Sequence, residues 1–141
     1  MSQSITLQRN EGAYTVSRLN PDDAIPSWAD GRGFVSITRT DEELSIVCLT
    51  ERVPPGVRAE IGWTCYKFLG PFAFEAAGII LAVVRPLSEN GMGVFVLSTF
   101  DGDIILLKSK DANIAERILK EAGHLILHPA KQRILNVPKN K

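Results

Sequence analysis

The sequence predicts an α+β fold, in which an antiparallel sheet carries its helices on one face. Over residues 63–127 the expected elements run strand, helix, strand, strand, helix, strand, which is the split βαβ order of ferredoxin-like folds. Apolar residues recur at helical spacing in two of these stretches and form continuous runs in the others. A thinner version of the same order precedes residue 63. We therefore expect two βαββαβ units in tandem, of which the first is degenerate.

The second unit is marked by clear stop signals. Its first helix is expected to end at Asn90-Gly91, and Pro86 inside this helix is expected to kink it or to end its regular part early. Asp101-Gly102 is a favoured dipeptide for a tight hairpin, and Gly123 ends the second helix. The strands of this unit are predicted at residues 63–69, 94–99, 104–108 and 125–127.

The first unit has the same order with weaker helices. Pro26 limits its first helix to a short stretch that reaches Trp28, and Pro54-Pro55-Gly56 occupies the place of the second, where no full helix is expected. A hairpin near Thr40 repeats the design of the hairpin near Asp101, which indicates an internal duplication. Strands are predicted at residues 5–8, 14–19, 34–38, 44–50 and 59–62. We divide the chain into a first unit of residues 1–62, a second unit of residues 63–128 and a basic tail of residues 129–141.

Two strands of the second unit are apolar at every position instead of alternating, namely residues 94–97 and 104–107. A sheet with one face in water alternates, whereas a continuous apolar run indicates that both faces are covered. Two helices cover one face. The other face has to be covered by the first half of the chain or by a second copy of it. We therefore expect the chain to associate, most simply as a homodimer.

Composition and charge restrict the class of protein. The 141 residues carry 16 Lys and Arg against 16 Asp and Glu, and the only basic concentration is the tail, which we interpret as a solvated terminus. We therefore expect no nucleic-acid partner. The longest apolar run, residues 76–84, is about half of a membrane span, so we expect no membrane contact. Cys48 and Cys65 without a secretory leader predict free thiols and a cytoplasmic protein.

No catalytic constellation emerges from the sequence. Asp101 and Asp103 flank a glycine and form either an acid–base pair or part of a turn, and we favour the turn for Asp101. The two histidines lie far from both cysteines, and no serine or cysteine stands in a nucleophile-elbow pattern. His124 follows the helix-ending Gly123, where its ring can meet exposed carbonyl groups. We expect no catalytic residue, no metal site and no cofactor, in a protein that is not an enzyme.

Small hydroxyl residues stand late in apolar strands of both units, which favours a polar ligand. They are Ser36 and Thr38 in the first unit and Ser98 and Thr99 in the second. Strand ends also offer free N–H and C=O groups, which suit the zwitterionic head of an amino acid. Each hydroxyl can instead satisfy the nearby backbone, and both interpretations stay open. Asp103 starts an apolar strand, where its carboxylate needs a donor or cation from the protein or from a ligand.

Two stretches resemble segments of the ACT-domain branch that includes the CASTOR arginine sensors and short bacterial homologues. They are residues 70–108, GPFAFEAAGIILAVVRPLSENGMGVFVLSTFDGDIILLK, and residues 34–54, FVSITRTDEELSIVCLTERVP. The motif S-T-[FY]-x-x-D is matched by Ser98, Thr99, Phe100 and Asp103. It carries the resemblance together with the upstream helix and the TRTDEELS hairpin. The resemblance implies a non-enzymatic module of two ACT units that senses a small molecule.

In the arginine sensors the ligand lies between two ACT units, and matching positions here define the site that the resemblance implies. Asp103 would pair with a ligand cation, Gly78 would allow close backbone approach, and Thr99 would exchange hydrogen bonds with the ligand. Gly102 stands where the sensors carry a larger residue, and this chain has two units instead of four, so an equivalent pocket would need a dimer. The implied ligand-binding residues are Ser36, Ile37, Glu75, Gly78, Ile79, Thr99, Phe100 and Asp103.

These observations together predict a regulatory protein that binds an amino acid or a similar small molecule. The alternative is an interaction module that has lost its ligand and uses an open sheet face for assembly. Gly102 and the missing helix at Pro54-Pro55-Gly56 favour this alternative.

Overall fold

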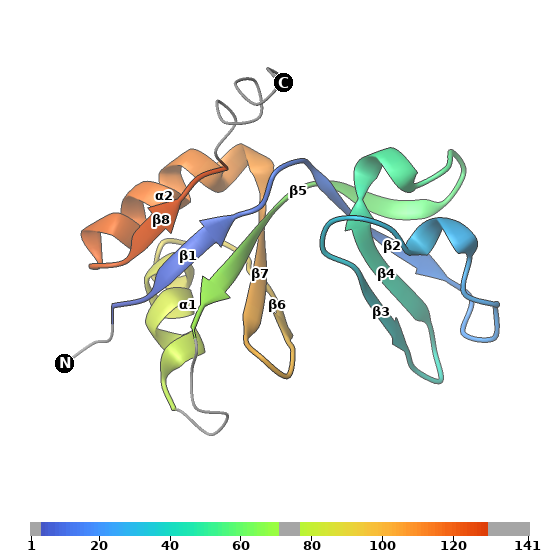
Figure 1. The fold of residues 1–141 in the computed structure, drawn as a ribbon, viewed down its shortest axis with the longest axis horizontal. Coiled ribbons are helices and arrows are strands. Elements are labelled where there is room, and N and C mark those ends of the chain that lie inside the picture. The colour runs from blue at the N-terminus through green and yellow to red at the C-terminus, as the bar shows by residue number, and fades with distance from the viewer. Residues whose placement is uncertain (1–3, 71–76, 130–141) are drawn as a thin grey trace, which may run out of the picture.

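The computed structural model describes residues 4–70 and 77–129, in which eight strands form one sheet that carries two α-helices (Figure 1). The strands are β1 Thr6–Arg9, β2 Tyr14–Leu19, β3 Ser36–Arg39, β4 Leu44–Leu49, β5 Arg58–Leu69, β6 Phe95–Ser98, β7 Asp103–Lys108 and β8 Leu125–Leu127. The α-helices are α1 Ile79–Glu89 and α2 Ala112–Glu121, and the short 3₁₀ turns are η1 Ser27–Ala29, η2 Thr50–Arg52 and η3 Ser109–Asp111. The predicted α+β class is confirmed. No helix of the described part has the length and apolar character needed to cross a membrane.

The long strand β5 connects the two units. Its first part pairs with β2, and its second part pairs with β1 on one edge and β7 on the other. We predicted a strand at residues 59–62 that runs on into the strand at residues 63–69, and the two do form a single strand through Gly62, which has a positive φ of 82°. We refer to β2, β3, β4 and the first part of β5 as the first unit, and to β1, the second part of β5, β6 to β8 and the helices as the second unit.

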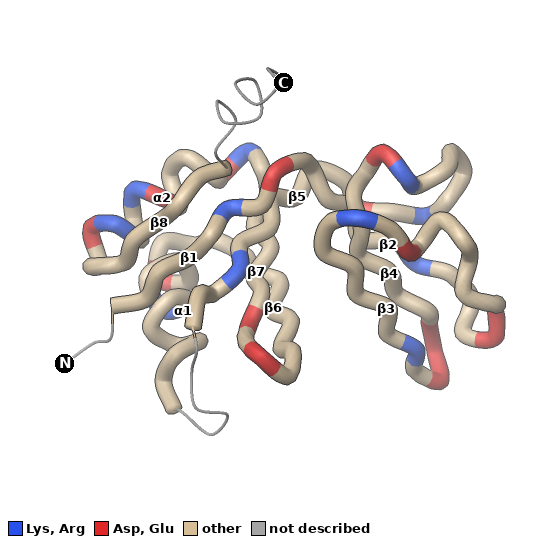
Figure 2. The backbone as a smooth tube through the Cα atoms, viewed as in Figure 1, with Lys and Arg blue, Asp and Glu red and all other residues tan. Residues whose placement is uncertain are grey.

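Within each unit the strands follow the ferredoxin-like order, with one addition. The first unit runs β3-β4-β2-β5, and the second runs β8-β1-β5-β7-β6. The addition is β1, which lies between β5 and β8 and pairs in parallel with β8, whereas all other pairs are antiparallel. The hydrogen bonds of this N-terminal strand therefore lie in the second unit's sheet, and the division of the chain at residue 62 stays a prediction. Basic and acidic positions are interspersed over both units (Figure 2).

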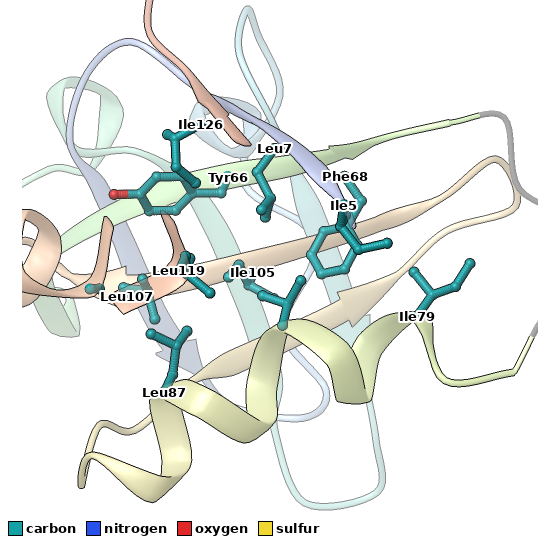
Figure 3. Packing of buried hydrophobic residues seen from close by; sticks show 12 residues of the cluster. Ile5, Leu7, Tyr66, Phe68, Ile79, Leu87, Ile105, Leu107, Leu119 and Ile126 are labelled. Carbon is teal, nitrogen blue, oxygen red and sulfur yellow. The ribbon is translucent and has the colours of Figure 1, made fainter. Parts of the chain in front are cut away.

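One face of the second unit's sheet packs against both helices (Figure 3). Side chains alternate along β7, so Ile105 and Leu107 face the helices while Ile104 and Leu106 face the other way. The helix-side cluster also includes Tyr66 and Phe68 of β5. Its remaining buried members are Ile5, Leu7, Ile79, Val83, Leu87, Ala115, Leu119 and Ile126.

The opposite face of this sheet is covered by the first unit. Tyr14, Val47 and Leu49 of the first unit form one buried cluster with Cys65, Ile104 and Leu106 of the second. The sequence predicted that strands apolar on both faces need such cover and left open whether the chain or a second copy supplies it. The first half of the chain supplies it, so these strands alone no longer require a dimer.

The outer face of the first unit has only a thin cover. Ala29 of η1 packs with Leu44, Ile46 and Cys48 of β4, and Trp28 of the same turn and the loop residues Val35 and Val53 complete this small cluster. The turns η1 and η2 stand where the second unit has α-helices. The expectation of one short helical stretch ending near Trp28, and of no full helix at Pro54-Pro55-Gly56, is confirmed.

Helix α1 continues through Pro86 because a histidine compensates for the missing hydrogen bond. Pro86 has no N–H to donate to the carbonyl of Ala82, and the ring Nε2 of His124 lies 2.9 Å from that oxygen. The backbone N–H of Ile5 donates to Nδ1 of His124 at 3.0 Å, so the proton of the neutral ring sits on Nε2. His124 therefore has a structural role, as the sequence favoured, but the carbonyl that it meets belongs to α1 and not to the end of the helix that Gly123 closes. Both helices end at glycines of positive φ, Gly91 and Gly123, as predicted.

Candidate functional site

An open groove of about 950 Å³ lies between the two units. Its lining comes from β1, β5, β7 and the end of β8 on the side of the second unit, and from Tyr14 and the loop before β3 on the side of the first. A groove of this size with polar walls suits a small molecule. We take it as the candidate functional site.

A row of four cross-strand neighbours forms the floor of the groove. Strand pairing places Gln8 next to Leu127 on one side and next to Lys67 on the other, and Lys67 next to Ile104. All four residues line the groove. Directly opposed residues in neighbouring strands have Cβ atoms about 5 Å apart, so Gln8 and Lys67 start from adjacent points of the floor. The Gln8 amide donates to the carbonyls of Arg9 at 3.0 Å and Leu127 at 3.4 Å.

Three cationic side chains line the groove, and they differ in their partners. Arg9 forms an ion pair with Glu116 at 2.9 Å, and Arg32 forms one with Glu51 at 3.2 Å. No carboxylate of the described residues lies within ion-pair distance of Lys67. Lys67 is thus the groove cation whose charge the described residues leave unpaired.

The first unit contributes a fixed loop at residues 30–34. Arg52 holds this loop, because its Nε donates to the carbonyl of Trp28 at 3.1 Å and its Nη1 to that of Arg32 at 2.8 Å. Gly33 has a positive φ of 84°, and a Cβ there would lie 3.0 Å from the hydroxyl oxygen of Tyr14. That hydroxyl accepts the backbone N–H of Phe34 at 3.0 Å. The loop Asp30-Gly31-Arg32-Gly33 is therefore a wall of the groove, which the sequence did not indicate.

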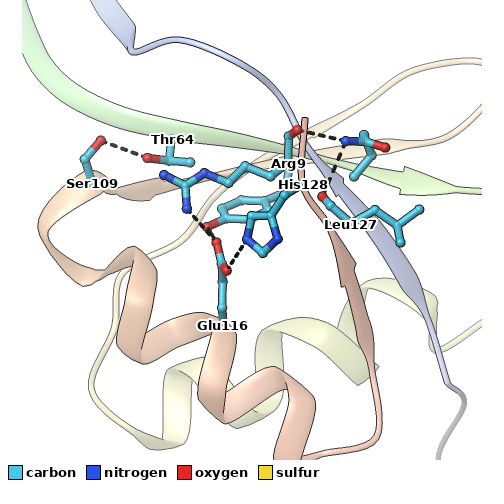
Figure 4. Close-up of polar contacts among 8 residues, drawn as sticks. Arg9, Thr64, Ser109, Glu116, Leu127 and His128 are labelled. Atoms are coloured by element: carbon cyan, nitrogen blue, oxygen red, sulfur yellow. Dashed lines mark hydrogen bonds and ion pairs between the residues drawn. The ribbon is translucent and has the colours of Figure 1, made fainter. Parts of the chain in front are cut away.

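A buried carboxylate lies beside the groove (Figure 4). Glu116 of α2 is only 6% exposed, and its Oε2 accepts the hydroxyl of Tyr66 at 2.6 Å and Nη1 of Arg9 at 2.9 Å. Its Oε1 lies 2.7 Å from Nε2 of His128. Arg9 and His128 also line the groove. On the same helix the apolar Ile114 is 49% exposed, whereas the charged Glu116 is buried.

The environment of Glu116 stabilises its ionised form. Burial acts to raise the pKa of this carboxyl, but hydrogen bonds from Tyr66, His128 and Arg9 outweigh burial and hold the pKa below its usual range. Burial raises the pKa of Tyr66, and the hydrogen bond to Glu116 raises it further. The cluster therefore carries a fixed negative charge that Arg9 balances.

The predicted hydroxyl and carboxylate residues of the β6–β7 hairpin form hydrogen bonds with each other and with the turn. Ser98 Oγ donates to Asp103 Oδ1 at 2.7 Å. The backbone N–H of Thr99 donates to the carbonyl of Gly102 at 2.7 Å, and Thr99 Oγ1 accepts the N–H of Gly102 at 3.2 Å. Asp103 thus has a donor partner within the protein, one of the two sources that the sequence left open.

Thr99 and Asp103 lie toward opposite faces of the sheet. Thr99 lines the groove. Asp103 alternates with Ile104 along β7 and shares the helix side with Ile105 and Leu107. One ligand in the groove of a single chain therefore meets Thr99 and not Asp103. Whether either residue binds a ligand stays a prediction.

The other predicted site residues lie on several separate elements. Ser36 and Ile37 lie on β3, Gly78 precedes α1 with a positive φ of 84°, and Ile79 is the buried first residue of that helix. Among the described residues outside its chain neighbours, no atom lies within 4 Å of a Cβ built on Gly78. The exposed Phe100 lies at the tip of the β6–β7 turn, and Glu75 lies outside the described residues. Within a single chain, β3 does not lie next to the start of α1 (Figure 1).

The two cysteines have the environment of core residues. Burial raises the pKa of the Cys65 thiol to about 12, against a hydrogen bond from Asn10 that lowers it. Burial also raises the pKa of Cys48. Thiols with such pKa values are poor nucleophiles at neutral pH. In the described part of the chain, no three or more His, Cys, Asp or Glu side chains are grouped to hold a metal ion.

Comparison with known families identifies two matches that together extend over most of the chain. A family model of the ACT domain matches residues 58–121, and a model of an N-terminal domain matches residues 12–56. The chain is 32% identical over 92 residues to the cytosolic arginine sensor for mTORC1 subunit 1 of Bos taurus. This match takes in 57% of the chain but only 28% of that relative's length.

Solved structures show the same fold. A protein of Agrobacterium tumefaciens is 54% identical and superimposes with a TM-score of 0.88, over 91% of this chain and 96% of that one. The regulatory subunit of aspartate kinase from Thermus thermophilus superimposes with a TM-score of 0.58 at 8% identity, over 82% of this chain and 96% of that subunit. At this identity the second likeness concerns the fold alone.

Proposed function

The chain is an ACT-domain protein of the CASTOR-like branch, and we propose that it is a non-catalytic regulatory protein that binds an amino acid between its two units. The groove between the units carries this proposal, because it combines the size for a small molecule with cations from both walls. The bovine relative is named as an arginine sensor, which supports an amino acid as the ligand class. We propose that the protein acts in the cytoplasm and without a nucleic-acid partner.

We further propose that the residues implied by the family resemblance contribute to binding when two copies associate. Thr99 lines the groove of its own chain, whereas Gly78, Ile79 and Asp103 lie on the helix side of the sheet. The strand β6 pairs only with β7 among the described strands, so its other edge offers backbone groups to a partner. A homodimer formed there would place Ser36 and Ile37, the start of α1 and the β6–β7 turn of different copies near each other.

The test is direct binding of amino acids to the purified protein. We expect at least one of the twenty amino acids to release or absorb heat in isothermal titration calorimetry and to raise the melting temperature. Asp103→Ala and Thr99→Val separate the two parts of the site, because only the second alters the groove of a single chain. The absence of heat and of any melting shift with all twenty would refute an amino-acid sensor.

Exposed apolar residues favour a second candidate function, an assembly module. Val96 of β6 is 37% exposed, and Phe100 at the neighbouring turn is 85% exposed. Such residues at a sheet edge suit a protein partner or a second copy. Light scattering distinguishes the two functions. An assembly module stays associated in Asp103→Ala and shows no response to amino acids. A sensor shows a ligand-induced melting shift, which Thr99→Val weakens when the ligand lies in the groove and Asp103→Ala weakens when it lies at the dimer site.

A further inference from the structure

The charges of the groove between the units indicate the chemistry of its ligand. We propose that this groove is a carboxylate-binding site, in which Lys67 is the central cation and Arg32 contacts the ligand from the opposite wall. The inference rests on the function proposed above and specifies its ligand as a small molecule that carries a carboxylate. No residue of this pair belongs to the site implied by the family resemblance.

Lys67 is an exposed residue at the margin of an apolar interior, where this interior meets the groove. On the same face of β5, two residues earlier, Cys65 is fully buried between the units. Across the sheet, Lys67 has Gln8 on one side and Ile104, which is 5% exposed, on the other. A cation beside low-dielectric walls focuses its field into the cleft and attracts anions. The ammonium of Lys67 is therefore placed to bind an anion from the groove.

Arg32 faces this floor from a loop that is already fixed. Arg52 binds the carbonyl of Arg32, so the backbone of the loop is held without any help from the Arg32 side chain. The Arg32 guanidinium pairs with Glu51, but both side chains are mostly exposed, at 71% and 62%. An ion pair that open to water contributes little. A ligand carboxylate can therefore replace Glu51 as the partner of Arg32 at small cost.

The other charged residues of the groove agree with this assignment. The charge of Arg9 is balanced by the buried Glu116, so Arg9 contributes little positive charge to a ligand. Glu11 is the acidic residue of the lining. It offers a partner for an ammonium group, which suits a zwitterionic amino acid better than a simple dicarboxylate. The charged groups that can pair with a ligand are thus the two cations Lys67 and Arg32 and the one carboxylate Glu11.

A ligand held in this way contacts both units. Lys67 belongs to β5 within the second unit, and Arg32 to the loop before β3 in the first. Binding would therefore stabilise one relative placement of the units, which is a route by which a bound ligand can alter a surface elsewhere.

The experiment measures binding to charge-neutral variants of the whole chain. Each of the twenty amino acids, succinate and inorganic phosphate is titrated separately at low ionic strength by calorimetry. The variants are Lys67→Met and Arg32→Gln, with Lys67→Arg to restore the charge. Matched controls are Lys120→Met and Arg117→Gln, which remove the same charges from exposed positions of α2. Circular dichroism of each variant verifies the fold.

We expect Lys67→Met to lower the affinity for the carboxylate ligand by about tenfold or more, because hydrogen bonds between charged groups are among the strongest in proteins. Arg32→Gln should have a smaller effect, of about threefold, because Arg32 gives up Glu51 on binding. Lys67→Arg and both α2 controls should bind within about twofold of the wild type, and added salt should weaken binding.

The outcomes separate this inference from the proposed function. If an amino acid binds the wild type and both groove variants equally, the inference is wrong and the function stands. If succinate binds in a Lys67-dependent way while no amino acid does, the carboxylate site stands and the amino-acid function is wrong. Phosphate that binds more tightly than every carboxylate overturns the ligand class, and no binding of any probe overturns both proposals.

Discussion

The hairpins β3–β4 and β6–β7 occupy the same place in the two units and close with the same turn. Each has a four-residue loop that starts with a threonine, Thr40 in the first unit and Thr99 in the second. The threonine N–H donates to the carbonyl of the last loop residue, at 2.9 Å for Thr40 and 2.7 Å for Thr99. Each hydroxyl accepts the N–H of that same residue at 3.2 Å. The threonine thus has the same structural role twice.

The residue pairs that flank these two turns differ, and the difference separates structural from functional candidates. In the second unit the pair is Ser98 with Asp103, joined by a hydrogen bond. In the first unit the equivalent pair is Arg39 with Leu44, and Leu44 is fully buried. The same turn forms in the first unit without a polar pair, so the turn does not require Asp103. The turn therefore accounts for the shared geometry of Thr99 in both hairpins but not for the presence of Asp103.

The cover over the two sheets differs more than the hairpins do. Ile46 on β4 and Ile105 on β7 each lie six residues after the turn threonine, and both are fully buried. Ile105 packs under two α-helices, whereas Ile46 packs under η1 and loop residues. One sheet design thus supports a thick core in one unit and a thin one in the other.

The largest expected effect tests this contrast with the matched variants Ile105→Ala and Ile46→Ala. We expect Ile105→Ala to lower the free energy of unfolding by about 4 kcal/mol and Ile46→Ala by about 2 kcal/mol. The cavity at Ile105 is enclosed by rigid elements, whereas loop residues can relax into the space at Ile46. Urea unfolding measures both, with Ile114→Ala, 49% exposed on α2, as the control. An equal or larger loss at Ile46 would contradict the thin cover.

The sequence allowed much of the fold to be predicted because its signals are local. The turn dipeptides, the glycines after both helices and the prolines in the first unit each act within a few residues. The insertion of β1 between β5 and β8 was not predicted, and neither was the pairing of the two halves of β5 with different units. Both depend on pairing between distant segments, which hydrophobic periodicity does not report.

The candidate groove was harder to predict than the fold, for a related reason. Lys67, Arg32 and Glu116 are ordinary charged residues in the sequence, and each acquires its role from segments far along the chain. Glu116, for example, meets Arg9 and Tyr66, which are 107 and 50 residues away. A motif search detects residues that are close in sequence, so it found the β6–β7 turn and missed the groove beside it.

The next prediction concerns a smaller loss of stability, and it compares a buried carboxylate of the second unit with an exposed carboxylate of the first. Glu116→Gln should cost about 2 kcal/mol at pH 7, because it removes a buried charge that Arg9, Tyr66 and His128 stabilise. Glu51→Gln removes an exposed ion pair and should leave the free energy of unfolding almost unchanged. Urea unfolding compares the two variants directly.

The pH dependence of the free energy of unfolding tests whether ionised Glu116 stabilises the fold. The pKa of Glu116 is lower in the folded than in the unfolded chain, so its stabilisation is present above the unfolded value of about 4.3 and is lost as the pH falls through the folded value. The wild type should therefore lose more stability than Glu116→Gln between pH 5 and pH 3, as measured by urea unfolding at each pH. Parallel curves for the two proteins would show that Glu116 is not the group that titrates.

The smallest effects return to the two turns. Thr40→Val and Thr99→Val should each cost about 1 kcal/mol, because each removes a hydroxyl that accepts the same backbone N–H. Asp103→Asn keeps an acceptor for Ser98 at a partly exposed position, so its free energy of unfolding should stay within about 0.5 kcal/mol of the wild type. Thermal and urea unfolding of the three variants, with and without an amino acid identified by calorimetry, complete the comparison. If Asp103→Asn retains stability but loses the ligand-induced melting shift, Asp103 serves the ligand; if it loses as much stability as Thr99→Val and keeps that shift, Asp103 belongs to the turn and the contrast between the hairpins is structural only.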